Sequence, residues 1–438
     1  MKELIEPRIP KGFRDFLPER EAQRLAIIGK LQRVFALFGF APIDTPVLEF
    51  AEVLLGKGGG ETDKEVYRFT DHGGRDVAMR FDLTVPFARF MAAHLAELPL
   101  PFRRWHAAKV WRGENTQRGR YREFMQVDFD VVGSDAASAD LEILLLMRES
   151  MKALGMEKFR IHFAHRGVFN AFLGARGLLE RSTDILRAID KLRKIGEEGA
   201  LAQLSEIGGA VNAERIIAFT RIAATSALTL ESVRAALGPA GADDPSIARL
   251  SVVAKCLEEL GVSDSFVLDP SITRGLDYYT GIVFETFLTD LPAIGSVCSG
   301  GRYDNLASLY TKQSLPGVGA SIGVDRLMAA MEELGLLEKG GSPSALLILC
   351  LEEGLLGTYH RLAESYRAAG IAAEVYPEKK KLAAQFAYAE KKGIPLALVC
   401  GEDEVKDGVV GLKDLRSRQS FDRLTPEAAK EKAAELLR

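Results

Sequence analysis

The sequence predicts a large α+β domain that is interrupted by a helical insertion and followed by a small α/β domain. Short β-prone runs occupy residues 66–133, and similar runs return at 266–288 and 296–303. Between them, an Ala- and Leu-rich stretch from approximately 170 to 262 has helical character. Beyond the Gly-, Ser- and Pro-rich residues 338–344, short apolar runs alternate with helices, a pattern typical of a small, largely parallel sheet.

Size and composition restrict the class of protein. The chain has 438 residues, of which 47% are apolar and 27% charged, so we expect two or three soluble globular domains. No apolar run is long enough to cross a bilayer, and the N-terminus lacks the apolar core of a signal peptide. The four cysteines are widely spaced without a CxxC pair, which disfavours a structural zinc site and favours a reducing cytoplasm. Since the net charge is −4, contacts with nucleic acid must come from local basic patches.

Two segments of the large domain have apolar spacing that predicts their secondary structure. The spacing of apolar residues predicts an amphipathic helix at residues 20–40, which Gly39 ends. In the run YREFMQVDFDVVG, Phe124, Gln126, Asp128 and Asp130 alternate with apolar side chains, which predicts a half-buried strand. Its polar face either meets solvent or lines a pocket.

Three constellations of residues suggest ligand chemistry. Residues 103–122 contain seven Lys or Arg and one acid, Glu114, so the loop either binds phosphates or is a solvated basic hairpin. RGLDYYTGIVFE (274–285) either brings backbone and phenol groups to a small ligand or is a turn with two packing tyrosines. GVGASIGVDRL (317–327) is a weak nucleotide signal, and close strand–helix packing explains it better in isolation.

The order of these motifs resembles class II aminoacyl-tRNA synthetases. Arg112-x-Glu114 with the basic loop and Phe124 resembles motif 2, the glycine-rich segment ending in Arg326 resembles motif 3, and Pro46 lies where motif 1 supplies a dimer interface. RGLDYYTG (274–281) and SGGRYDNL (299–306) resemble the two histidine-specific motifs of the histidyl-tRNA synthetase family, and residues 401–415 resemble its anticodon-binding domain. The resemblance implies a catalytic domain at 1–335 built on an antiparallel sheet, a helical insertion at approximately 170–262, a linker at 336–344 and an anticodon-binding domain at 345–438. It also implies a cytoplasmic homodimer.

The same resemblance implies roles for residues in ATP binding. Arg112 would bind the α-phosphate and Glu114 the adenine amino group. Phe124 would stack under the adenine ring, Arg326 would hold the γ-phosphate, and Arg120 is a further phosphate ligand.

For the amino acid, the resemblance implies that Asp82, Thr84 and Gln126 hold the histidine ammonium. Asp130, Tyr278 and Tyr279 would then bind the imidazole, which donates at one nitrogen and accepts at the other. A site that bonds both nitrogens rejects most other amino acids, because its buried polar groups would stay unpaired.

For catalysis, the substrate carboxylate is already an anion and needs no general base. Arg112 and Arg274 would both contact the substrates and neutralise the charge that develops on the α-phosphate, with Mg²⁺ assisting the departure of pyrophosphate. The expected substrates are ATP, L-histidine and histidine tRNA, and no protein side chains are assigned as metal ligands.

Three alternatives remain. Some proteins similar to this family do not charge tRNA and serve as regulatory subunits of ATP phosphoribosyltransferase, but these lose the C-terminal domain and the catalytic arginines. This chain has residues beyond 345 and retains Arg112, Arg274 and Arg326. A synthetase for another amino acid is disfavoured by RGLDYYTG and GGRYD, and a tRNA-binding module without catalysis is disfavoured by the arginines.

Overall fold

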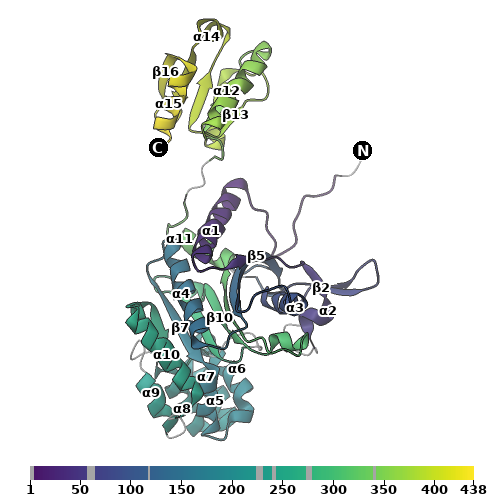
Figure 1. Cartoon of the computed structure of the whole chain (residues 1–438), viewed down its shortest axis with the longest axis vertical. Coiled ribbons are helices and arrows are strands. Elements are labelled where there is room, and N and C mark those ends of the chain that lie inside the picture. Colours follow the sequence, from purple (N-terminus) through teal and green to yellow (C-terminus); the bar gives the residue numbers. More distant parts are fainter. Residues whose placement is uncertain are drawn as a thin grey trace. The chain divides into compact units, whose positions relative to one another are not determined.

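The computed structural model describes residues 4–56, 65–116, 119–222, 230–238, 243–272, 279–338 and 342–438. These form two compact units, one comprising most residues up to Leu337 and the other Glu338–Arg438 with Phe16–Gln23 (Figure 1). In the described part of the chain, no helix is both long and apolar enough to span a membrane.

The first unit is built on an eight-stranded sheet with the order β1-β5-β6-β11-β10-β9-β7-β8. Its five central pairings are antiparallel, whereas the edge strands β1 and β8 run parallel to their neighbours. The predicted antiparallel sheet is therefore confirmed. In chain order the strands are β1 (Ala41–Pro42), β5 (Phe102–Trp111), β6 (Glu123–Val132), β7 (Phe159–His165), β8 (Phe266–Leu268), β9 (Ile282–Leu288), β10 (Cys298–Tyr303) and β11 (Gly317–Gly323).

One face of this sheet is apolar and is covered by helices. These are α1 (Pro18–Leu37), α4 (Ala137–Ala153) and α11 (Val324–Glu333). Val127, Phe129 and Val131 of β6 lie in the core that these helices share, and the rings of Phe35 and Phe129 are 5.1 Å apart. Helix α1 corresponds to the helix predicted at 20–40, and β6 to the alternating strand. Since the apolar side chains of β6 face the helices, its polar side chains are left for the opposite face.

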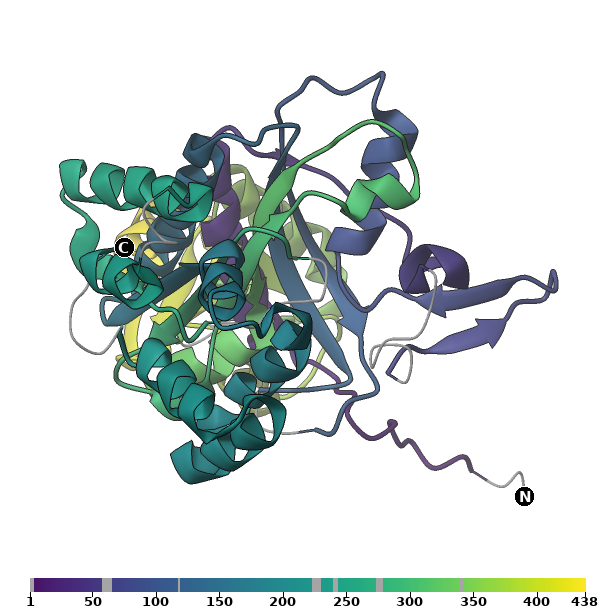
Figure 2. The same cartoon turned by 90° about the horizontal axis from the view of Figure 1, so that it is seen from below.

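A smaller sheet projects from the main body of this unit (Figure 2). It consists of β2 (Leu48–Phe50), β4 (Asp76–Met79) and β3 (Arg68–Thr70), all antiparallel in that order. Helices α2 (Ala51–Leu55) and α3 (Thr84–His94) flank it, and a separate apolar cluster joins them to one end of strands β5, β6 and β10 of the large sheet.

The predicted insertion is helical and lies between β7 and β8. Figure 1 shows its helices gathered beside α4 and β7. They are α5 (Arg166–Gly174), α6 (Ser182–Asp190), α7 (Leu192–Gly208), α8 (Ala210–Thr220), α9 (Leu230–Leu237) and α10 (Pro245–Glu259). Short 3₁₀ turns are η2 (Leu179–Arg181), η5 (Ser263–Ser265), η6 (Pro292–Ile294) and η7 (Leu306–Leu309).

The second unit is a five-stranded sheet with helices, in the order β13-β12-β14-β15-β16. Its first three strands are parallel, as predicted, but β15 and β16 are antiparallel, because a tight turn at 415–418 joins them as a hairpin. The elements are β12 (Leu346–Ile348), η8 (Glu353–Leu355), α12 (Leu356–Ala368), β13 (Ala373–Val375), α13 (Leu382–Lys392), β14 (Leu396–Val399), α14 (Glu402–Asp407), β15 (Val410–Asp414), β16 (Gln419–Leu424) and α15 (Pro426–Leu436).

Candidate active site

A pocket of about 680 Å³ opens to solvent at one end of the large sheet. It is lined by the loop between β5 and β6, by β6 itself and by the start of α11. Five residues expected to bind ATP lie in this lining: Arg112, Glu114, Arg120, Phe124 and Arg326. The basic loop is therefore folded over a concave surface.

The arginines of this pocket are held in fixed positions. Arg112 donates from Nε to the carbonyl of Phe81 (2.9 Å), and its guanidinium lies 5.2 Å from the centre of the Phe124 ring. Arg120 Nη1 lies 3.5 Å from Glu114 Oε2. Arg326 donates from Nη1 to the carbonyl of Ser296 (2.6 Å). A cationic group that is already oriented loses little freedom when it meets an anion, which favours phosphate binding.

Asp325 links three of the segments that form and surround the pocket. Its Oδ2 accepts from the backbone N–H of Met125 (2.7 Å), and its Oδ1 pairs with Arg14. The guanidinium of Arg14 in turn lies 3.2 Å from the centre of the Tyr121 ring. One buried carboxylate therefore ties the N-terminal segment, strand β6 and the start of α11 together.

From the inner end of the pocket, polar residues continue along one face of β6. Gln126 lines the pocket and donates from Nε2 to Ser321 Oγ on β11 (2.6 Å). Asp128 follows two residues later, opposite Ser321 on one side and His106 on the other. Asp130 comes next, and both aspartates are 2% exposed. This polar face therefore does not meet solvent, and at Gln126 it lines the pocket.

Asp130 already has two partners. Its Oδ2 lies 2.7 Å from Nη2 of Arg104, which is fully buried, and its Oδ1 accepts from the hydroxyl of Tyr303 (2.6 Å). Arg104 also lies over the ring of Phe87, 4.2 Å from its centre. Burial raises the pKa of the Tyr303 hydroxyl well above its usual value, so this phenol remains a donor at neutral pH.

Asp82 and Thr84 lie at the N-terminus of α3. Asp82 Oδ1 accepts from the backbone N–H of Val85 (3.1 Å), and both residues are buried. The electrostatic field of Asp82 reaches Asp128, Asp130 and Tyr279, so these side chains surround one region.

Glycines make the space for this cluster. A Cβ on Gly319 would lie 2.0 Å from Asp130 Oδ1, and one on Gly301 would lie 3.0 Å from the ring of Tyr279. Gly319 of β11 and Gly301 of β10 are therefore explained by close packing against a charged and an aromatic side chain, since a side chain there would displace them.

Two of the predicted site residues, Arg274 and Tyr278, lie outside the described residues, as do Gln117 and Arg118 of the basic loop. The expected pairing of Arg112 with Arg274 therefore stays a prediction. Tyr279 is described, and it packs between two apolar clusters beside the aspartates.

Comparisons with known proteins agree with this geometry. Residues 12–327 match the family described as "Histidyl-tRNA synthetase", and residues 345–436 match "Anticodon binding domain". The chain belongs to the histidyl-tRNA synthetase family. Relatives named "Histidine--tRNA ligase" include those of Treponema denticola, 49% identical over 98% of each chain, and Rhodopirellula baltica, 47% identical over 96% of each chain.

Solved structures of the family have the same fold. A histidyl-tRNA synthetase from Nostoc is 31% identical, covers 99% of this chain and 100% of its own, and superposes with a TM-score of 0.86. A structure from Bacillus halodurans, described as an ATP phosphoribosyltransferase regulatory subunit/histidyl-tRNA synthetase, is 24% identical with a TM-score of 0.72 and shows only the fold. Because the full-length relatives and the match at 345–436 both include the C-terminal domain, synthetase function is favoured over the regulatory alternative.

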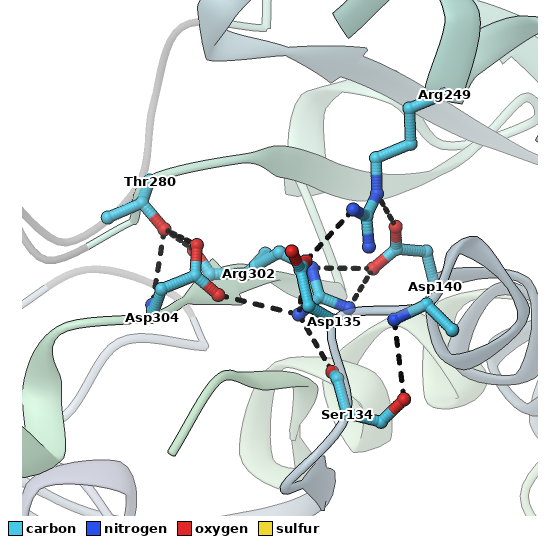
Figure 3. A network of polar contacts seen from close by, with 8 residues as sticks. Ser134, Asp135, Asp140, Arg249, Thr280, Arg302 and Asp304 are labelled. Atoms are coloured by element: carbon cyan, nitrogen blue, oxygen red, sulfur yellow. Dashed lines mark hydrogen bonds and ion pairs between the residues drawn. The ribbon is translucent and has the colours of Figure 1, made fainter. Parts of the chain in front are cut away.

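A buried polar network joins the insertion to the second histidine motif of this family (Figure 3). Asp140 of α4 accepts at Oδ1 from Nε and Nη2 of Arg302 (3.0 and 2.8 Å) and pairs through Oδ2 with Arg249 of α10 (2.5 Å). The hydroxyl of Thr280 donates to the carboxylate of Asp304 (2.6 Å). The backbone N–H of Thr280 donates to the carbonyl of Arg302 (2.8 Å). Strand β10 and the residues just before β9 are therefore anchored to the same ion pairs.

Sequence reasoning did not select several of these residues. Arg104, Tyr303 and Asp325 lie inside three of the motifs, but their individual roles were not predicted, because the partners that they bind come from other segments of the chain. Asp128 did carry a signal, because it alternates with Gln126 and Asp130 on the polar face of β6.

Proposed function

We propose that the chain acts as a histidine–tRNA ligase through the pocket and polar face described above. ATP and L-histidine would react there to give histidyl-adenylate and pyrophosphate, and histidine would then pass to the 3′ end of its tRNA. The observation that carries this proposal is that Arg112, Glu114, Arg120, Phe124 and Arg326 line one pocket that leads directly to Gln126.

In the first step, ATP would lie in the pocket with its adenine on Phe124 and its amino group at Glu114. Arg326 and Arg120 would bind phosphate oxygens, and Arg112 would hold the α-phosphate. The histidine carboxylate attacks the α-phosphorus, and the bond to pyrophosphate breaks. Since two anions must meet, fixed positive charge at Arg112 and Arg274 lowers the barrier by stabilising the transition state.

Magnesium would enter as the ATP complex. In the described residues, no three His, Cys, Asp or Glu side chains converge on a metal site, and both oxygens of Asp325 are occupied. This fits a cation carried by phosphate oxygens and water, as Mg²⁺ usually is, with little help from the protein.

Histidine would lie along the polar face of β6, with its ammonium near Asp82, Thr84 and Gln126. Its ring would extend toward Asp130, Tyr278 and Tyr279. In the second step, a ribose hydroxyl of the terminal adenosine attacks the carbonyl carbon of the adenylate, and AMP leaves. No covalent enzyme intermediate is needed.

The protein would work as a cytoplasmic homodimer. Val47, Leu48 and Phe50, next to Pro46, and Phe69 on β3 expose large apolar side chains on the projecting sheet, which suits a contact with a second copy. All four cysteines are free thiols, which fits a reducing compartment.

Amino-acid-dependent exchange of pyrophosphate into ATP tests this function. We expect exchange with L-histidine and none with proline or threonine. Exchange that depends on another amino acid would contradict the assignment. If exchange is absent but the chain stimulates an ATP phosphoribosyltransferase, the regulatory alternative is correct.

A further inference from the structure

The N-terminal segment at residues 11–15 packs against the loop that carries the ATP-binding candidates. The pairing of β11 with β6 ends at Gln126, where β11 passes into α11, so another segment can meet the first residues of β6. The backbone N–H groups of Arg122 and Glu123 both point to the carbonyl oxygen of Gly12, at 2.9 and 3.5 Å. The segment is therefore joined to the base of the loop by backbone hydrogen bonds.

Gly12 is fitted closely against this loop. Its φ is +89°, in the left-handed region, and a Cβ there would lie 2.7 Å from Cγ of Arg122. The next residue, Phe13, meets the ring of Tyr67 edge-on, with 6.2 Å between the ring centres. These contacts hold in place the backbone that carries Arg14.

The side chain of Arg14 contacts both walls of the pocket. Its guanidinium lies 3.2 Å from the centre of the Tyr121 ring in the loop, and it pairs with Oδ1 of Asp325 at the start of α11. Tyr121 and Asp325 line the pocket, together with the phosphate-binding candidates Arg120 in the loop and Arg326 in α11. One side chain therefore links the two segments from which these arginines come.

Arg14 also neutralises a negative charge beside the expected phosphate site. The side chain of Asp325 is 4% exposed, and Asp325 directly precedes Arg326 in the chain. A buried carboxylate without a counter-charge would repel the triphosphate of ATP, because charges interact strongly where water is excluded. Since Arg14 balances Asp325, the positive charge of Arg326 remains available to phosphate.

We propose that Arg14 is a positioning residue for ATP. It holds the loop and the start of α11 together through Tyr121 and Asp325, and it cancels the charge of Asp325. This inference rests on the proposed function, because it takes the pocket as the ATP site. Arg14 acts through residues of the ATP pocket, so its loss should weaken the binding of ATP and leave the binding of histidine unchanged.

Calorimetric titration of the full chain with the magnesium complex of ATP, and separately with L-histidine, tests the proposal. We expect Arg14→Gln, which keeps a polar side chain but removes the charge, to weaken ATP binding about 10-fold. Histidine binding should change less than twofold, because histidine contacts other residues. Arg14→Lys retains the charge opposite Asp325 but loses the flat group that lies on Tyr121, so it should weaken ATP binding only about 3-fold.

Arg8→Gln is the matched control. Arg8 precedes Arg14 by six residues, and its side chain is 82% exposed, so both affinities should equal those of the wild type. Fluorescence of Trp105 and Trp111, both on β5, verifies that each variant is folded.

Hydrogen exchange gives a readout that a general loss of stability would not produce. Residues 11–15 are outside the lining of the pocket. Coupling between two sites is reciprocal, so ATP should slow exchange of the N–H groups at residues 11–15 at least threefold in the wild type. This protection should be present in Arg8→Gln and absent in Arg14→Gln.

The proposal is overturned if Arg14→Gln binds ATP normally, or if it loses affinity for ATP and histidine equally, which would indicate a structural role only. Protection of residues 11–15 by ATP in Arg14→Gln would overturn it as well. In pyrophosphate exchange, the KM of Arg14→Gln for ATP should rise with the dissociation constant, while the KM for histidine stays within twofold of the wild type.

Binding and turnover separate this proposal from the proposed function. If the wild type binds ATP but performs no exchange with histidine, the proposed function fails, and the binding data still decide the role of Arg14. If exchange is normal in both the wild type and Arg14→Gln, the proposed function stands and the role of Arg14 is refuted. Absence of ATP binding in the wild type would overturn both.

Discussion

The ion pairs around Asp140 allow the contribution of a single buried carboxylate to be measured. Asp140 is fully buried and accepts three hydrogen bonds, two from Arg302 and one from Arg249 (Figure 3). Substitution Asp140→Asn keeps the shape of the side chain but removes its charge and turns an amide NH₂ toward guanidinium donors. Arg302, which is 2% exposed, then lacks its closest counter-charge.

We expect this substitution to destabilise the first unit by about 3 kcal/mol. Removing one partner of a buried ion pair typically costs about 3–5 kcal/mol. Asp135 and Asp304 each remain 3.4 Å from Arg302 Nη1, which lowers the cost toward the smaller value. In a unit of this size, the midpoint of thermal unfolding should fall by roughly 4 °C.

Tryptophan fluorescence is the suitable assay, because both tryptophans lie on β5 of the first unit and report little on the second. Asp135→Asn is the matched control, because its side chain is 68% exposed and contacts the same two arginines. An exposed pair contributes about 1 kcal/mol or less, so its midpoint should move little. Equal shifts in the two variants would falsify the argument that burial of Asp140 gives the network its strength.

Three further predictions concern the site. Arg112→Ala should lower the rate of histidyl-adenylate formation by about 10²–10⁴-fold in single-turnover measurements, because fixed arginine charge at a transferring phosphate has effects of this size; a loss under tenfold would contradict its role. Burial raises the pKa of Asp128 to about 7, so the protonated carboxyl contributes stability that is fully present below about pH 4 and is lost as the pH rises through 7. In urea unfolding, Asp128→Asn should therefore flatten the decline of stability between these pH values. An unchanged pH profile in this variant would refute the prediction. Gly319→Ala should displace Asp130, because the new Cβ would lie 2.0 Å from its carboxylate; the Kd for histidine should rise at least tenfold, and normal binding would show that the strand yields.

Much of the fold could be predicted from local patterns. The amphipathic spacing of residues 20–40 predicted α1, and the alternation around Gln126 predicted β6 with its two faces. The alternation of apolar runs and helices predicted the parallel strands of the second unit. The antiparallel hairpin β15–β16 did not, because neither strand has the continuous apolar run on which that prediction depended.

The part of the site that depends on contacts between residues far apart in the chain could not be predicted from the sequence. The hydroxyl of Tyr303 meets Asp130 across 173 residues, and Asp325 binds the N–H of Met125 across 200. Periodicity cannot reveal such contacts, because it reports only which face of an element is buried. The motifs nevertheless predicted which ATP-binding candidates share a pocket, since most of them come from one loop.

The face of β6 that carries Asp128 and Asp130 contains buried polar atoms that have no hydrogen-bond partner within the described residues. Burial of Asp128 with an unpaired oxygen, and of Arg104 with Nε and Nη1 unpaired, lowers the stability of the free protein. A ligand with a matching donor recovers this free energy on binding, whereas a similar ligand without one leaves the penalty in place and adds the loss of water. Under the proposed function, selectivity for an imidazole would depend less on the shape of the cavity than on how completely the ligand satisfies polar groups that the fold itself leaves unsatisfied.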